Sequence, residues 1–432
     1  MRGIRGVALT DVPERATVNP TRCAVVNARL FDSASGTLRP QTTIVIEGER
    51  IVGVTQQPLQ VDDAQRIDAG GRVVLPGLID AHVHVVAASA DLVGLALQPP
   101  SLVGAQSSRI MRGMLMRGFT TVRDAAGADF GLQEAVERSL YEGPRLFISG
   151  FPISQTGGHA DMRPKGVRGA GMFCSCAGIG LVGAIADGVD EVRRAVREQV
   201  RNGANQIKIM AGGGISSPTD PIDGTQFSLQ ELRAAVEEAE AANLYALAHA
   251  YSPRAVTRAV QAGVRSIEHG NLIDEATARV MKQHGAYLVP TLSTYAALAD
   301  EGQRLGWSAA MMDKLAVVQA RGIEAVRIAR AEGVPVVFGT DLLGHMHERQ
   351  SGEFTLRTAA MSPVEALQSA TITAARLMRQ EAHIGQLVPG AWADLLVVDG
   401  DPTLGLEMLA DPVRGIRLLM KAGRVLRNEL GA

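Results

Sequence analysis

Two histidines end the apolar run GLIDAHVHVV, which covers residues 77–86. His82 and His84 are separated by one residue, and alternate side chains of a β-strand lie on the same face. Both imidazoles therefore point into one space if this run is a strand. Neutral imidazole is a common ligand of Zn²⁺ and of neighbouring first-row metals. The spacing indicates the first half of a metal site.

Further polar side chains stand in or at the ends of later predicted strands. They are Lys208, His249, His269 and Asp341. A single histidine on a strand is more often a hydrogen-bonded core residue than a ligand, and a lone buried ammonium is costly unless it is paired or deprotonated. Six such groups at one end of a sheet need a strong organising charge. A divalent cation supplies that charge, because imidazole and carboxylate are its usual ligands.

The middle of the chain alternates strand and helix signals, which places the fold in the α/β class. Eight strand candidates occur: VVLPGLIDAHVH, FTTVRD, RLFISG, NQIKIMAG, LYALAHA, RSIEHG, AYLVPT and VPVVFGTD. Among the helical stretches, SLQELRAAVEEAEAANL opens with Ser228 and carries Glu231 three residues later, a capping-box pattern. A further helix is expected over residues 361–378. Eight strands alternating with helices predict a (β/α)8 TIM barrel, whose active site lies at the carboxyl ends of the strands.

Both ends of the chain differ in sequence pattern from the middle, because they lack the alternation of strand and helix signals. Residues 24–75 and the last fifty residues contain short Val- and Ile-rich runs divided by Gly, Asp and Pro, which is typical of strands. We expect a small β-sandwich domain built from residues 24–75 and 384–432. The barrel then covers residues 76–383, and residues 1–23 form an N-terminal extension.

The composition is that of an ordinary globular protein. Of 432 residues, 46% are hydrophobic and 20% charged, and the formal net charge is −2, so nothing favours a nucleic-acid or acidic-membrane partner. No stretch suits a membrane span, and the apolar run near the N-terminus is too short for a signal peptide. Cys23, Cys174 and Cys176 are the three cysteines; the odd, low count predicts a reducing, cytoplasmic location. The C-x-C pair lacks the second pair of a zinc knuckle and is interpreted as plain thiols.

The motifs GLIDAHVH, IKIMAGGG, HAY, IEHG and GTD, in this order, resemble the metal-dependent amidohydrolase superfamily. Two flanking stretches agree, VLPGLID and GQLVPGAWADLLVVDGDP, so the resemblance covers residues 24–426. It implies two divalent metal ions, with Zn²⁺ expected. The implied ligands are His82, His84 and Asp341 for one metal, His249 and His269 for the other, and Lys208, carbamylated by CO2, as the bridge. An unmodified Lys208 would leave room for a mononuclear site.

The stretches QTGGHAD and IKIMAGGGISSPTDPIDGTQFS resemble one branch of that superfamily, which contains Xaa-Pro dipeptidases, N-acyl amino acid hydrolases and bacterial ochratoxin-degrading amidohydrolases. The resemblance implies hydrolysis of N-acyl aromatic L-amino acids by a metal-bridging hydroxide, including ochratoxin A to ochratoxin alpha and L-phenylalanine. Asp341 would transfer protons, His159 would lie near the substrate carbonyl, and Tyr251 would contact the substrate carboxylate. His345 and His347, after the eighth strand, are additional candidates for substrate binding, although exposed loop histidines are common.

Several alternatives stay open. The chain could be an Xaa-Pro dipeptidase, or a cyclic-amide hydrolase or deaminase, because one scaffold supports all of these reactions. A carboxylate contact at Tyr251 favours substrates with a free C-terminal carboxylate. A non-catalytic assembly protein is disfavoured because no implied ligand is missing. Arg123 and Asp124 could pair with each other, or Asp124 could support a ligand histidine. The resemblance also implies a homo-oligomer, an octamer.

Overall fold

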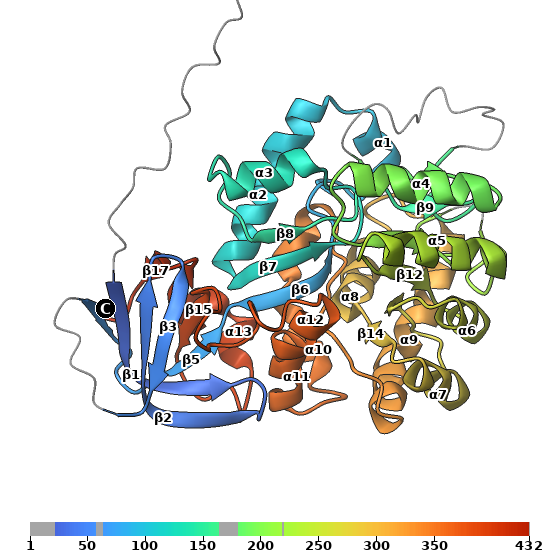
Figure 1. Cartoon of the computed structure of the whole chain (residues 1–432). Helices are drawn as coiled ribbons and strands as arrows, with labels where there is room; N and C mark the ends of the chain where they lie inside the picture. Colours follow the sequence, from blue (N-terminus) through green and yellow to red (C-terminus); the bar gives the residue numbers. More distant parts are fainter. Residues whose placement is uncertain (1–21, 58–63, 164–179, 218–219, 432) are drawn as a thin grey trace, which may run out of the picture.

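The computed structural model describes residues 22–57, 64–163, 180–217 and 220–431. Cys174 and Cys176 lie outside these residues. Figure 1 shows a β-sheet on one side of the molecule, where blue N-terminal strands and red C-terminal strands lie together. The other side holds parallel strands surrounded by helices. This is the TIM-barrel-like α/β fold with a separate sheet domain that the sequence predicted.

The separate sheet contains strands from both ends of the chain. It comprises β1 (Arg22–Asp32), β2 (Thr37–Glu47), β3 (Arg50–Thr55), β4 (Gln65–Asp68), β5 (Val73–Pro76), β15 (Leu395–Val398), β16 (Ile416–Lys421) and β17 (Arg424–Asn428). Their order is β17-β16-β15-β5-β1-β2-β3, with β4 also paired to β1. The strands are thus hydrogen-bonded in one continuous order, and the arrangement of this sheet in the two facing layers of a sandwich stays a prediction. In addition, β1 already includes residues 22 and 23, which the sequence assigned to the N-terminal extension.

The two faces of this sheet bury different cores, as alternation along a strand requires. In β15, Leu395 and Val397 belong to a core formed mainly by the sheet's own strands. Leu396 and Val398 belong to the large core shared with the barrel-like part. The sheet is therefore packed against the rest of the molecule through one face.

The remaining strands run parallel in two hydrogen-bonded groups. The first group is β6 (Leu78–Val83), β7 (Phe119–Asp124) and β8 (Arg145–Phe147); the second is β9 (Ile153–Ser154), β10 (Ala184–Ile185), β11 (Ile207–Met210), β12 (Ala246–Ala250), β13 (Ser266–His269) and β14 (Tyr287–Val289). The predicted eighth strand makes only an isolated ladder bridge, between Val336 and Leu288. Its backbone is nevertheless hydrogen-bonded to both β14 and β6, since Val337 N donates to Leu288 O and Phe338 O accepts from Ala81 N.

The helices of the described residues follow these strands along the chain. They are α1 (Leu92–Ala96), α2 (Pro100–Met116), α3 (Phe130–Glu137), α4 (Val189–Arg201), α5 (Leu229–Ala241), α6 (Pro253–Gln261), α7 (Glu275–Gln283), α8 (Leu292–Glu301), α9 (Ala309–Ala331), the 3-10 helix η2 (Gly344–Arg349), α10 (Gly352–Arg357), α11 (Pro363–Ser369), α12 (Ile372–Leu377), α13 (Glu407–Ala410) and α14 (Pro412–Gly415). The capping box of Ser228 and Glu231 is confirmed at the start of α5. None of the helices described here has an apolar run long enough to cross a bilayer.

The helix predicted over residues 361–378 is interrupted, which the sequence pattern did not reveal. It forms α11 and α12 with a break at Ala370 and Thr371. The carbonyl of Ala370 accepts a hydrogen bond from Ile79 N in β6 at 2.8 Å. This carbonyl is therefore hydrogen-bonded to a strand rather than within a helix, which explains why the helix stops there.

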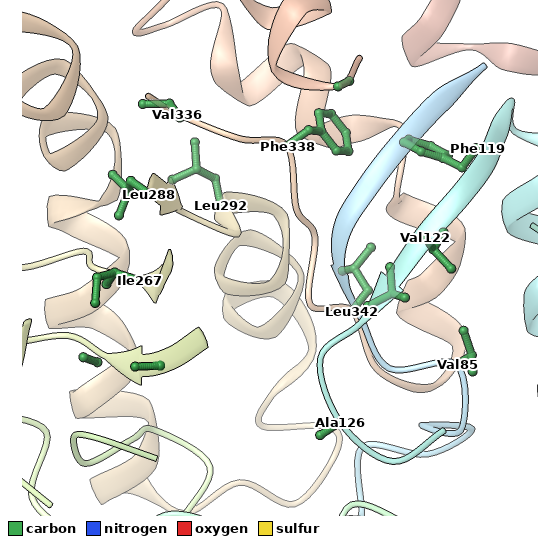
Figure 2. Packing of buried hydrophobic residues seen from close by; sticks show 14 of the residues in the cluster. Val85, Phe119, Val122, Ala126, Ile267, Leu288, Leu292, Val336, Phe338 and Leu342 are labelled. Atoms are coloured by element: carbon green, nitrogen blue, oxygen red, sulfur yellow. The ribbon is translucent and has the colours of Figure 1, made fainter. Parts of the chain in front are cut away.

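Large apolar side chains pack between the strands and the helices around them (Figure 2). Phe119 of β7 lies beside Phe338 of the predicted eighth strand, with ring centroids 5.4 Å apart. Ile267 and Leu288 continue this core along β13 and β14. This packing holds the strands whose carboxyl ends carry the polar residues described next.

Candidate active site

A cavity lies at the carboxyl ends of the parallel strands. All six residues predicted as metal ligands line it: His82, His84, Lys208, His249, His269 and Asp341. They come from β6, β11, β12, β13 and the last residue of the predicted eighth strand, as well as from the residue that follows β6. The fold thus brings together side chains that are far apart in sequence.

His82 and His84 face one oxygen of Asp341. The distances from Asp341 Oδ1 are 3.5 Å to His82 Nε2 and 3.0 Å to His84 Nε2. The other ring nitrogens are already engaged: His82 Nδ1 lies 2.6 Å from Glu268 Oε2, and His84 Nδ1 lies 2.9 Å from Ala126 O. When Nδ1 donates to an acceptor, the Nε2 lone pair is free for a metal, as is usual for ligand histidines.

Glu268 is a functional residue that the sequence reading missed. It is completely buried, and Arg123 donates to its Oε1 at 2.8 Å. Although burial raises its pKa, the charge of Arg123 and the hydrogen bond from His82 lower the pKa of Glu268 well below its usual value. Glu268 is therefore an anion that orients His82. The sequence pattern that could have identified Glu268 is a glutamate inside an apolar strand, because a buried acid is tolerated only when it is paired.

Arg123 and Asp124 do not pair with each other. Arg123 donates a hydrogen bond to Glu268. Asp124 accepts hydrogen bonds from the backbone N–H of Val85, at 2.7 Å, and of Ala128, at 3.1 Å. Burial raises the pKa of Asp124 to about 6. Asp124 thus fixes the backbone directly after His84 rather than the imidazole itself.

His249 and His269 form the other side of the cavity floor, with ring centroids 4.6 Å apart. His249 Nε2 lies 3.0 Å from Gly213 O, and His269 Nδ1 lies 2.8 Å from Thr291 Oγ1. Burial lowers the pKa of both imidazoles well below the usual value. Both rings are therefore neutral, and each keeps one nitrogen available as a ligand.

Lys208 is buried on β11 beside these histidines, with only 2% of its surface exposed. Burial lowers the pKa of Lys208 to about 8, although the negative charges of Glu268 and Asp341 act to raise it. The neutral fraction of the amine near pH 7 is thus much larger than that of an ordinary lysine, and a neutral amine is the form that reacts with CO2. The environment of Lys208 fits the carbamate that the family resemblance implies.

The donor set as a whole fits a transition-metal site. His82, His269 and Asp341 offer atoms that all lie within 4.8 Å of one another, and nitrogen and carboxylate donors suit Zn²⁺. His269 and Asp341 also have left-handed backbone conformations, with φ of 78° and 54°. Non-glycine residues are rarely held in this region, and strained positions of this kind cluster at functional sites.

His159 lies on the cavity wall, where its ring stacks on that of His249 at 4.2 Å. His159 Nδ1 is 3.3 Å from Asp220 Oδ2. A Cβ atom at Gly214 would lie 1.9 Å from the His159 ring, so only glycine leaves room for this imidazole. Lys314 holds the loop in place, because its Nζ donates to the carbonyls of Gly214 and Asp220. Sequence reasoning did not identify Asp220 or Lys314.

Of the other predicted substrate contacts, only Tyr251 lines the cavity among the described residues. His347 is buried, and its Nε2 lies 3.0 Å from Ala87 O. Burial lowers the pKa of His347 to about 3. His345 pairs with Glu301 and is largely exposed. The roles assigned to His345 and His347 therefore stay predictions without support from this geometry.

Part of the cavity wall is apolar. It is formed by Leu92, Met162, Leu181, Met210, Ile215, Leu298, Trp307 and Leu343. Trp307 remains partly exposed. A cavity lined both by polar, charged residues and by large apolar ones suits a substrate with a reactive polar group and a large apolar part.

Comparison with known proteins identifies the family. Residues 73–426 match the amidohydrolase family. The chain belongs to this family. This amidohydrolase is 32% identical to ochratoxinase from Aspergillus niger over 382 residues, which cover 82% of the chain and 76% of the relative. Its relatives make it a hydrolytic enzyme that acts on C–N bonds, so the non-catalytic alternative is wrong.

Solved structures agree with this assignment. A crystal structure of another amidohydrolase has a TM-score of 0.93 at 48% identity and covers 95% of this chain and all of that one. A prolidase complexed with N-methylphosphonate-L-proline has a TM-score of 0.91 at 47% identity, covering 94% of this amidohydrolase and 100% of the prolidase. For A. niger ochratoxinase the TM-score is 0.81 at 28% identity, with coverage of 95% and 96%.

Proposed function

We propose that this amidohydrolase cleaves the amide bond of N-acyl aromatic L-amino acids, and that ochratoxin A is one substrate, giving ochratoxin alpha and L-phenylalanine. The cavity carries this proposal, because it combines the histidine and carboxylate floor with an apolar wall that includes Trp307. The similarity to ochratoxinase points to the same class of amide.

The residues that would hold the metal ions are His82, His84 and Asp341 for the first, His249 and His269 for the second, and carbamylated Lys208 between them. We propose Zn²⁺ because the donors are imidazole nitrogens and carboxylate oxygens. Such cations, when bound, lower the pKa of a coordinated water and polarise a carbonyl.

The side chains of the cavity would divide the remaining work. Asp341 accepts a proton from the attacking water and passes it to the leaving amine, which would otherwise be a poor leaving group. His159 donates a hydrogen bond to the carbonyl oxygen as negative charge develops on it. Tyr251 donates a hydrogen bond to the carboxylate of the amino acid, and the apolar wall contacts the aromatic acyl group.

Xaa-Pro dipeptides are the second candidate substrates. The favouring observation is the prolidase structure, which is 47% identical and holds N-methylphosphonate-L-proline. Both substrate classes have a free carboxylate next to the leaving nitrogen. They differ in the acyl group, which is an amino acid in the dipeptides.

A hydrolysis panel on zinc-loaded enzyme tests the proposal. The panel contains ochratoxin A, N-acetyl-L-phenylalanine, several Xaa-Pro dipeptides and a cyclic amide, and the released amine is quantified. Release of phenylalanine from the first two is the expected result. Activity confined to Xaa-Pro would assign a dipeptidase, and turnover of the cyclic amide alone would contradict the role of Tyr251. The Asp341→Asn variant, checked for retained metal, controls for contaminating hydrolases.

We also propose that the eight parallel segments close into a (β/α)8 barrel and that the enzyme is a cytoplasmic homo-octamer. Support for closure comes from the hydrogen bonds of Val337 and Phe338 to both neighbouring strands, and from Asn205 N donating to Ile148 O at 2.7 Å. Light scattering of the purified enzyme tests the oligomer.

A further inference from the structure

A chain of buried hydroxyl groups leads from one metal-ligand candidate to the substrate cavity. His269 Nδ1 lies 2.8 Å from Thr291 Oγ1. Thr291 Oγ1 donates to the hydroxyl of Tyr295 at 3.4 Å, and the Tyr295 hydroxyl donates to that of Tyr251 at 3.1 Å. Each of these four residues is at most 2% exposed, so water does not compete for the bonds.

The direction of this chain follows from proton counting. If His269 presents Nε2 to the cavity, Nδ1 carries the ring proton and must donate to Thr291. A hydroxyl group has one proton, so Thr291 donates onward to Tyr295, and Tyr295 donates to Tyr251. The proton of Tyr251 is then directed to a group other than Tyr295. Because Tyr251 lines the cavity, its hydroxyl can donate to an acceptor bound there.

We propose that Thr291 and Tyr295 are positioning residues that fix Tyr251 as a hydrogen-bond donor to an anionic group of the substrate. The enzyme would thereby favour amides that bear a carboxylate over matched neutral amides. This inference rests on the proposed function and extends it to the residues that set substrate selectivity. Thr291 and Tyr295 contribute through Tyr251.

The backbone at Thr291 supports a specific role for its side chain. Thr291 has φ of 49° and ψ of 51°, a left-handed conformation. Glycine or asparagine would adopt this conformation at lower cost, and a β-branched residue there is a genuine outlier. The cost is offset if the hydroxyl is needed, and the Thr291 hydroxyl contacts both His269 and Tyr295.

Aromatic packing holds the ring of Tyr251, the last residue of this hydrogen-bonded series, in place. The Tyr251 ring stacks on that of His269, with centroids 5.2 Å apart and an interplanar angle of 29°. Tyr295 meets Tyr251 edge-on at 6.2 Å. Loss of the Tyr295 hydroxyl should therefore leave the Tyr251 ring in place and free only its O–H to rotate.

The experiment compares Tyr295→Phe, Tyr251→Phe and the double variant in the zinc-loaded enzyme. For N-acetyl-L-phenylalanine we expect each single variant to raise KM about 10-fold, with kcat changed less than about 3-fold, because one hydrogen bond to a charged group is lost or weakened. The double variant should match Tyr251→Phe, since Tyr295 acts through Tyr251. N-acetyl-L-phenylalaninamide should be far less affected.

Thr291→Val tests the link to His269 with the same branched shape, and Thr291→Ser should restore wild-type KM. Tyr287→Phe on β14 removes a tyrosine hydroxyl away from the cavity and should change nothing. Equal losses for the acid and the amide, or additive losses in the double variant, would overturn the inference.

A binding measurement separates this inference from the proposed function. Calorimetry gives the Kd of L-phenylalanine, and Tyr295→Phe should weaken it about 10-fold while Tyr287→Phe leaves it unchanged. If the wild type hydrolyses no N-acyl amino acid, the proposed function fails, and calorimetry still decides whether Tyr295 contributes to carboxylate binding. An unchanged Kd in Tyr295→Phe would overturn the inference even in an active enzyme.

Discussion

His159 reaches the cavity because the residue that faces it has no side chain. At Gly214 a methyl group would overlap the imidazole, with its carbon 1.9 Å from the ring. The same glycine donates its backbone N–H to Asp220 Oδ2, which also lies 3.3 Å from His159 Nδ1. The loop that follows β11, which contains Gly214 and Asp220, thus forms the surroundings of His159, a residue from a different loop.

We expect Gly214→Ala to displace His159 and lower kcat by about 100-fold, the lower range for a lost oxyanion donor. Metal content should be unchanged, because the three atoms nearest to a Cβ at Gly214 all belong to His159, which is not an implied ligand. Steady-state kinetics and metal analysis measure both effects. Gly352→Ala is the matched control, since nothing lies within 4 Å of a Cβ there. Full activity in Gly214→Ala would remove His159 from the mechanism.

The residues that the sequence predicted as metal ligands line one cavity, whereas several of their hydrogen-bond partners were not predicted. The i, i+2 spacing of His82 and His84 and the strand-end positions of the other ligands are visible in a single chain, because strand periodicity is local. Glu268 and Tyr295 were missed, since their roles depend on which strands and helices meet in space. His347 was predicted to bind substrate, but the burial that ties it to Ala87 is a tertiary property.

At the scale of elements, a buried ion pair joins the start and end of α10. Glu353 and Arg357 are both completely buried, and Arg357 Nε donates to Glu353 Oε1 at 2.8 Å. Glu353 also accepts from Ser293 N at the start of α8, and Arg357 donates to Val337 O in the predicted eighth strand. The pair therefore connects a short helix to two elements that flank the cavity.

Arg357→Met should destabilise the protein by about 3–5 kcal/mol, because it leaves the Glu353 carboxylate buried without its cation. The double variant Glu353→Gln/Arg357→Met should lose less, since no unpaired charge remains and glutamine can still accept from Ser293. Urea denaturation of the wild type, Arg357→Met, Glu353→Gln and the double variant measures the coupling. Additive losses would contradict this account of α10.

Element boundaries show where sequence patterns stop being informative. The capping box at Ser228 is a local signal, and α5 begins where it predicts. The break between α11 and α12 depends on a hydrogen bond from Ile79, which lies far away in the chain. The predicted eighth strand likewise has strand-like residues, but Pro335 lacks an N–H and Gly339 packs against His82, so little regular ladder forms.

At the scale of the whole molecule, ionic contacts join the two ends of the chain within the sheet. Asp399, directly after β15, accepts hydrogen bonds from Arg72, before β5, at 2.8 Å and from Arg417 of β16. Partial burial raises the pKa of Asp399, but the hydrogen bonds from Arg417 and Arg72 outweigh this and lower it below its usual value. Arg29 of β1 and Asp401 form a second such contact at 2.9 Å.

Asp399→Asn should reduce the free energy of unfolding at pH 7 by no more than about 1 kcal/mol, because the group is partly exposed and screened by solvent. The folded-state pKa is depressed, so the contribution is fully present above the unfolded pKa of about 3.9. It is lost as the pH falls through the folded value. Urea titrations of both proteins between pH 3.5 and 7 measure the difference, which should narrow only at the acid end. A constant difference would contradict the ionic role.

Metal binding should stabilise the entire fold, because the implied ligands come from β6, β11, β12, β13 and the residue Asp341. We expect chelation to lower Tm and Zn²⁺ to restore it, with a gain of about 4 kcal/mol when free metal is 1,000 times Kd. Differential scanning calorimetry measures the shift. His82→Ala should show a much smaller response, and an unchanged Tm in the wild type would argue against a metal at this site.

The pairing of β5 with β15 has a consequence for biosynthesis. Residues 73–76 emerge from the ribosome early, whereas their antiparallel partners, residues 395–398, are made near the end of the chain. Until residues 395–398 have been made, one edge of the apolar strand VVLP lacks this partner, and an unpaired apolar edge invites pairing with other chains. Contacts so distant in sequence also form slowly. The nascent protein therefore has a long interval in which this edge is exposed, and chains that terminate before residue 395 should aggregate.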